Sequence, residues 1–291
     1  MAVIVFKRLP WRSPPQIDLY LPTRHFSSDM NNREAALRIA TFLTTFVSSA
    51  FLLAGAALAE VRTESFDYKQ GDTTLEGFIA YDDAQTGKRP GVLIFPQWTG
   101  LSDHERNAAR DFAKLGYVAM VADVYGKGVR PAPPMDSGVE MGKYMKDRPL
   151  LRSRVKAGFD TFAQRADVNA AKIAVIGYCF GGTAALEAGR EGLPAAAIVT
   201  LHGVLSNPTP ADAKNFKSPV LVLHGADDAV VSPKEVEEFQ AEMKAAKADL
   251  QFITYSGAVH GFTQAGNTYN ASAARRSWGA MQSLFKETLA P

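Results

Sequence analysis

The stretch from Ala174 to Ala184 constrains the fold more than any other part of the chain. An apolar run ends at Gly177, a helix-forming run begins after Cys179, and Gly177 and Gly181 flank that cysteine two residues away on each side. A strained strand-to-helix turn crowds those two positions, and glycine is the residue that fits there. The pattern predicts a turn that lifts the sulfur above a sheet, where the N–H groups opening the next helix favour its thiolate.

A lone cysteine at the end of a strand is more often a small core residue, so the interpretation depends on the rest of the chain. The 291 residues carry a net charge of +2, which argues against nucleic acid as the main partner. One cysteine cannot form an internal disulfide, and it excludes a cysteine-rich metal site. We expect no cofactor, no metal, a small-molecule ligand and a monomer.

Residues 1–59 differ from the rest and are interpreted as an N-terminal extension with a signal peptide. Met30 is the expected start, because a basic segment follows it, then an uncharged run from Ile39 that ends in Ala-Leu-Ala at Ala59. This order is typical of a secretory signal peptide, which predicts cleavage after Ala59 and a periplasmic protein that meets the membrane only transiently. The alternative is an uncleaved membrane anchor, since the run approaches spanning length.

Residues 60–291 have a steady composition and a size that suits one domain. Two alternating segments, 61–68 and 74–81, predict an antiparallel pair joined at Gly71-Asp72. Apolar runs then alternate with helix-forming segments, which predicts an α/β fold with a doubly wound, mostly parallel sheet and helices on both faces. The expected strands are 91–95, 117–122, 172–178, 195–201, 220–224 and 250–255, and the expected helices are 103–115, 135–165 with a break near Pro149, 180–190, 233–247 and 271–289.

Chemistry-bearing residues follow several of these strands, where ligands of such sheets bind. His224-Gly-Ala-Asp-Asp228 and, further on, His260-Gly-Phe262 lie downstream of Cys179. A cysteine nucleophile needs a base and then an acid, and histidine can be both near neutral pH. A carboxylate behind the histidine holds its tautomer and stabilises the imidazolium. By contrast, His104 is expected to be solvated and Trp278 to pack on a helix face.

With Gly-Tyr-Cys-Phe-Gly-Gly, His-Gly-x-x-Asp-x-x-Val and His-Gly-Phe, the chain from about Thr63 onward resembles the dienelactone hydrolase family of the α/β-hydrolase superfamily. The resemblance implies an α/β-hydrolase fold and a triad of Cys179, Asp228 and His260, with Asp228 favoured over Asp227 by motif spacing. It also implies that the backbone N–H groups of Trp98 and Phe180 form the oxyanion hole.

The chain departs from the family pattern in the substrate pocket. Gln97 stands where the family commonly has a glutamate that assists thiolate formation, and glutamine cannot take a proton. Lys127 and Gln264 match the two arginines that hold the dienelactone carboxylate, so dienelactone itself is not carried over as the substrate. Arg130 is a candidate replacement for the missing charge, although an exposed loop arginine is usually only solvated. His202 follows a strand, where it is expected either to line the pocket or to have a structural role.

These residues predict an exported hydrolase of carboxylic esters, lactones or thioesters that works through a Cys-His-Asp triad and an acyl-thioester intermediate. The alternative is a non-catalytic exported binding protein that keeps the fold and the pocket, with Gln97 marking the lost activation. The intact triad favours the enzyme.

Overall fold

The computed structural model describes residues 60–290. The predicted signal peptide, the Met30 start and the alternative membrane anchor lie outside that range. Within it, no helix combines the length and the apolar character needed to cross a bilayer.

One eight-stranded sheet organises the domain, in the order β1-β2-β4-β3-β5-β6-β7-β8. β1 and β2 form an antiparallel hairpin, β2 pairs antiparallel with β4, and the remaining strands run parallel to one another. The predicted mostly parallel sheet is therefore confirmed. The strands are β1 (Val61–Gln70), β2 (Thr73–Asp82), β3 (Arg89–Phe95), β4 (Val118–Ala122), β5 (Val168–Tyr178), β6 (Ala197–Leu201), β7 (Val220–Gly225) and β8 (Leu250–Tyr255).

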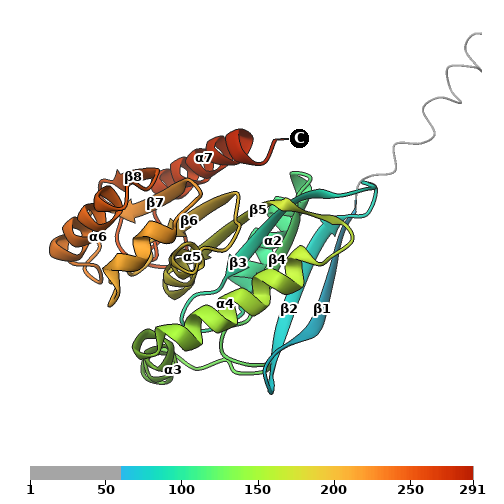
Figure 1. Cartoon of the computed structure of the whole chain (residues 1–291), viewed down its shortest axis with the longest axis horizontal. Helices are drawn as coiled ribbons and strands as arrows, with labels where there is room; N and C mark the ends of the chain where they lie inside the picture. Colours follow the sequence, from blue (N-terminus) through green and yellow to red (C-terminus); the bar gives the residue numbers. More distant parts are fainter. Residues whose placement is uncertain (1–59, 291) are drawn as a thin grey trace, which may run out of the picture. The chain divides into compact units, whose positions relative to one another are not determined.

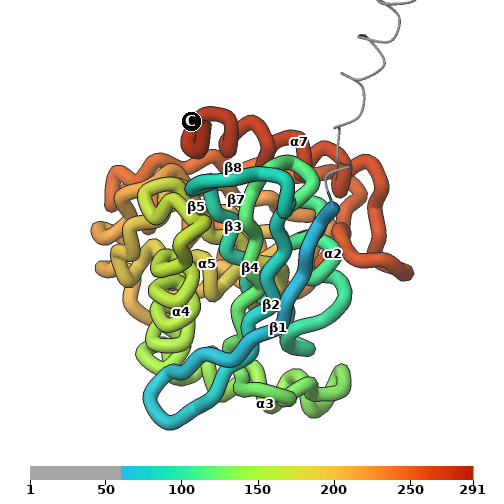
Figure 2. Tube along the Cα trace, turned by 90° about the vertical axis from the view of Figure 1, so that its right-hand side faces the viewer, coloured from blue at the N-terminus to red at the C-terminus, as the bar shows by residue number. Residues whose placement is uncertain are grey.

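Helices cover both faces of the sheet (Figure 1). Residues of α3, α4, α5 and α6 pack into one core cluster, and residues of α2 and α7 pack into a second cluster on the other face. Figure 2 shows α4 and α2 on opposite sides of the β1–β2 hairpin. The helices are α2 (Asp103–Lys114), α3 (Met135–Lys146), α4 (Arg148–Ala163), α5 (Phe180–Arg190), α6 (Pro233–Ala245) and α7 (Ala271–Thr288), with a 3-10 turn η1 (Pro210–Asn215).

Local signals explain where these helices begin. Ser102 caps α2, and Glu105 completes a capping box with it. The predicted break near Pro149 lies at Asp147, whose side chain accepts a hydrogen bond from the Leu150 N–H and caps α4. Pro149 falls in the first turn of α4, where a missing N–H costs nothing. Several strand ends differ from expectation by two residues or more, most of all β5, which begins at Val168, and the sequence did not predict η1.

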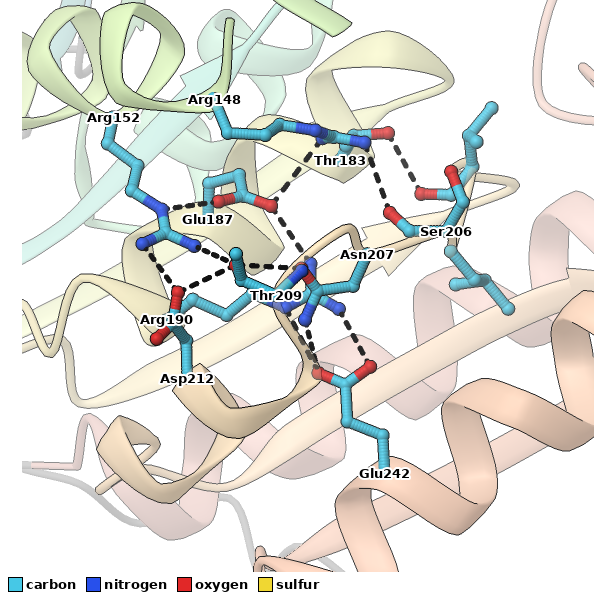
Figure 3. Close-up of polar contacts among 12 residues, drawn as sticks. Arg148, Arg152, Thr183, Glu187, Arg190, Ser206, Asn207, Thr209, Asp212 and Glu242 are labelled. Atoms are coloured by element: carbon cyan, nitrogen blue, oxygen red, sulfur yellow. Dashed lines mark hydrogen bonds and ion pairs between the residues drawn. The ribbon is translucent and has the colours of Figure 1, made fainter. Parts of the chain in front are cut away.

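Buried charges fix the loop between β6 and β7, and Figure 3 shows the contacts that its residues make with them. Its Ser206 carbonyl accepts from Arg148, and its Asn207 side chain donates to Glu242. Glu187 on α5, which is fully buried, pairs with three arginines: Arg148, Arg152 and Arg190. The loop therefore has a fixed position relative to α4, α5 and α6.

Candidate active site

The turn between β5 and α5 places Cys179 in a strained conformation, with φ 52° and ψ −117°. A Cβ added to Gly177 would lie 1.9 Å from the Gly181 carbonyl oxygen. One added to Gly181 would lie 2.0 Å from the carbonyl oxygen of Phe95 on the neighbouring strand. Neither position has room for a side chain, as the sequence predicts, because backbone atoms of the same turn and of β3 occupy the space that a Cβ would need.

Three predicted residues meet above this turn. His260 Nε2 lies 3.1 Å from Cys179 Sγ, and His260 Nδ1 lies 2.9 Å from Asp228 Oδ2. Asp228 Oδ1 accepts the N–H groups of Val230 and Val231, which fix the carboxylate. The neighbouring Asp227 has an exposed side chain, so the turn selects Asp228 as the partner of the histidine.

The electrostatics favour a charged histidine. Burial alone would lower the pKa of His260, but the hydrogen bonds and negative charges of Asp228 and Cys179 raise it to about 10. Burial opposes ionisation of Asp228 too, yet its hydrogen bond to His260 and the two loop amides hold its pKa below the ordinary value. A sulfur at hydrogen-bond distance from an imidazolium is suited to nucleophilic attack, and the imidazolium can return a proton to a leaving group.

Two backbone N–H groups are free beside the sulfur. Among the described residues, neither the Trp98 N–H nor the Phe180 N–H donates to a backbone carbonyl. The carbonyl of Gln97 accepts from Gly100 N–H at 2.9 Å, which closes a turn. Because the Gln97 carbonyl and the Trp98 N–H belong to one planar peptide, that bond also fixes the direction of the Trp98 N–H.

Side chains from two other elements hold the same loop. Glu105, fully buried on α2, accepts the Gln97 N–H and the Ser102 N–H and hydroxyl. Tyr125 donates its hydroxyl to the Trp98 carbonyl at 3.0 Å, and its ring stacks on Phe180. Sequence reasoning missed Glu105 and Tyr125 as parts of the site. The Ser-x-x-Glu capping box was a signal for Glu105.

A cavity of about 260 Å³ opens onto the sulfur. Apart from Cys179 and His260, its lining carries no titratable side chain. Sequence analysis did not single out Met141, Val204 and Val230, because three separate segments bring them here. The other lining residues are Gln97, Trp98, Gly261, Gln264 and Thr268.

The two candidate cations lie elsewhere. Lys127 is paired at 2.6 Å with Asp67 on β1, and Arg130 is paired at 3.0 Å with Glu76 on β2. Neither lines the cavity, and carboxylates of the β1–β2 hairpin hold both side chains, so their role in holding substrate stays a prediction.

His202 lies beside the cavity and does not line it. It is fully buried, and its Nε2 lies 2.9 Å from Thr263 Oγ1. Its ring stands edge-on to His260, with centroids 5.3 Å apart. Burial, aided by the positive charge of His260, lowers the pKa of His202 to about 3, so the ring is neutral. This packing behind His260 favours the structural alternative, and a direct role in the pocket stays a prediction. No group of three or more metal-ligating side chains occurs among residues 60–290.

The sheet order, the cysteine turn and the downstream aspartate and histidine define an α/β-hydrolase. A model of the dienelactone hydrolase family matches residues 75–289, and the chain belongs to that family. It is 28% identical over 230 residues to a probable 2-oxo-3-(5-oxofuran-2-ylidene)propanoate lactonase of Bradyrhizobium sp., covering 74% of this chain and 92% of the relative. A putative carboxymethylenebutenolidase of Yersinia pestis is also 28% identical, with 75% and 85% covered.

Among solved structures, a dienelactone hydrolase-like promiscuous phosphotriesterase from metagenomic libraries superposes with a TM-score of 0.75. It is 37% identical and is matched over 79% of this chain and 99% of its own. Family and relatives together make this chain an ester-bond hydrolase of the dienelactone hydrolase type.

Proposed function

We propose that the protein hydrolyses uncharged carboxylic esters, lactones or thioesters through Cys179, His260 and Asp228. The observation that carries this proposal is the continuous line of hydrogen bonds from the sulfur through the imidazole to the carboxylate. The uncharged cavity lining supports neutral substrates, since an anionic lactone would find no arginine or lysine there.

In the first half of the reaction, the Cys179 thiolate attacks the carbonyl carbon and the carbonyl oxygen becomes an oxyanion. The N–H groups of Trp98 and Phe180 stabilise that oxyanion. The His260 imidazolium donates its proton to the leaving oxygen, the carbon–oxygen bond breaks, and an acyl-thioester remains on the sulfur.

In the second half, neutral His260 takes a proton from water, whose oxygen attacks the thioester carbonyl. The acid is released, and the sulfur leaves as a thiolate beside the restored imidazolium. Asp228 holds the imidazole and stabilises its charge throughout. Gln97 cannot act as a base, so His260 performs every proton transfer.

Esterase assays with p-nitrophenyl acetate test this mechanism. The wild type should show turnover with a burst of nitrophenol, and mass spectrometry should find the acyl group on Cys179. Cys179→Ala should keep the circular dichroism of the wild type and lose turnover. His260→Ala should lose about a thousandfold in rate, as partners that act as a unit do. Gln97→Glu, which restores the family's carboxylate, should keep or raise the rate.

A His260→Ala enzyme within tenfold of wild type, or an adduct on another residue, contradicts the mechanism. A folded wild type without turnover or burst on any ester of a panel would favour the alternative, a non-catalytic binding protein.

A second candidate activity is hydrolysis of neutral phosphotriesters. A 37% identical relative is titled a promiscuous phosphotriesterase, and the uncharged cavity suits a substrate without an ionised group. Paraoxon is the probe: wild type should release nitrophenol slowly and Cys179→Ala should not. Equal release by both proteins would exclude this activity.

Export with cleavage after Ala59 is also proposed, on the uncharged run and the Ala-Leu-Ala ending. N-terminal sequencing of protein from an exporting host is the test. A mature chain that starts at Glu60 is expected, and one that still starts at Met1 or Met30 would overturn the proposal.

A further inference from the structure

A second cavity, of about 370 Å³, lies where α2, α7 and the ends of β5 and β6 meet. Its volume falls in the range of about 300–1,000 Å³ that small-molecule sites occupy. The segment after His260 separates it from the active-site cavity: Gln264 and Thr268 line the active site, whereas Thr263 and Tyr269 line this second space. The two cavities are therefore distinct.

The floor of this cavity carries a polar group without a partner. Tyr178 lines it and is 4% exposed, and its hydroxyl makes no hydrogen bond to another described residue. Buried tyrosine hydroxyls usually find a partner, so an open one is a place for a ligand oxygen.

His104, expected from the sequence to be solvated, instead packs edge-on against Tyr178 with ring centroids 4.7 Å apart. Its Nε2 is buried without a partner, and burial lowers its pKa, so the ring is neutral. It therefore adds no charge to the cavity.

The walls of the cavity combine aromatic rings with charged side chains. Tyr269 and Trp278 line the cavity, and Tyr269 is 52% exposed. Two charged residues also line it. Asp111 lies 2.7 Å from Lys114 in a half-exposed pair within α2, whereas Arg275 forms no salt bridge with any described residue. Arg275 is therefore the cation open to a ligand, and a guanidinium matches a carboxylate in a two-point contact.

We propose that this cavity binds a small aromatic carboxylate, with the ring against the aromatic walls, the carboxylate on Arg275 and a further oxygen on the Tyr178 hydroxyl. This site is separate from the proposed ester hydrolysis and does not depend on it. Aromatic side chains favour a flat ring, and the arginine and the phenol fix its two ends.

Calorimetric titration of the full chain with 4-hydroxybenzoate tests the site, with benzoate for comparison because it lacks the second oxygen. Cys179 is the chain's one cysteine, so iodoacetamide alkylates the active site selectively and places a group in its cavity. We expect a dissociation constant on the order of 1 mM or below for 4-hydroxybenzoate, unchanged within twofold after alkylation.

Arg275→Gln should weaken binding at least fivefold, whereas Arg276→Gln, at the next position and outside the lining, should not change it. Tyr178→Phe should bring 4-hydroxybenzoate down to the affinity of benzoate. Loss of binding on alkylation would place the ligand in the active site and overturn the proposal. So would equal affinities of the two arginine variants, or no heat of binding at about 10 mM ligand.

Discussion

Two adjacent aspartates in the turn after β7 have different surroundings. Asp228 is buried against His260, whereas Asp227 points to solvent and contributes its backbone N–H to the Ala258 carbonyl. Asp228→Asn should cost about 10⁴-fold in kcat, because an amide holds the imidazole in the wrong tautomer. Asp227→Asn is the matched control and should stay within threefold of wild type. Similar rates for the two variants in an ester assay would show that the carboxylate has no part in the reaction.

The raised pKa of His260 gives a second prediction at the residue scale. Burial opposes the charge, but Asp228 and Cys179 outweigh burial and raise the pKa to about 10, above an ordinary value of about 6.5. Between pH 6.5 and about 10, the folded state thus keeps on His260 a proton that the unfolded state releases. The contribution of this proton to the free energy of unfolding is fully present below pH 6.5 and is lost as the pH rises to about 10.

Nuclear magnetic resonance of the His260 ring measures this directly. The wild-type ring should titrate well above 6.5, and Asp228→Asn should move the titration down, because the variant loses the carboxylate that stabilises the imidazolium. A wild-type ring that titrates near 6.5 would contradict the assignment.

At the scale of elements, α2 supports the loop that presents the Trp98 N–H. Glu105→Gln keeps the size of the side chain but replaces one of the two acceptor oxygens by a donor, beside N–H groups that also donate. We expect kcat to fall by up to about a hundredfold, the lower end of what removing an oxyanion donor costs, because the N–H is displaced and not lost. KM should change less, because most residues lining the cavity lie outside this loop.

The matched control is Asp103→Asn in the same helical turn, whose side chain is 88% exposed. It should leave kcat within twofold of wild type. If Glu105→Gln lost stability without any loss of kcat in the folded enzyme, the carboxylate would be a structural cap only.

Sequence patterns predicted the elements well where the signal is local. The apolar runs of the inner parallel strands lie buried on both faces. Gly177 and Gly181, two residues from Cys179, are packed against backbone of the same turn and of one neighbouring strand. Sequence patterns could not predict the partners of the long polar side chains. Lys127 pairs with Asp67, 60 residues away in the sequence, and Arg130 pairs with Glu76, 54 residues away, because the hairpin runs along the edge of the sheet. The residues that line the cavity come together in the same way, from segments far apart in the chain.

At the scale of the whole domain, one buried carboxylate joins several elements. Glu187 and Arg190 are fully buried on α5, Arg148 and Arg152 come from α4, and Glu242 from α6 (Figure 3). Burial lowers the pKa of Arg148 despite the nearby carboxylate, so keeping its guanidinium charged inside the domain costs free energy. Such a network stabilises only when it is complete, because any member left alone is a buried charge without a partner.

Glu187→Gln should therefore destabilise the domain by about 3–5 kcal/mol, since three arginines lose their shared carboxylate. For a domain of this size, we expect the melting temperature to fall by about 10 °C. Glu238→Gln is the control, because Glu238 pairs with Lys234 at the surface, and its removal should change stability by less than about 0.5 kcal/mol. Thermal unfolding followed by circular dichroism compares the two variants. A Glu187→Gln protein that melts together with the Glu238→Gln control would show that the arginines find other partners.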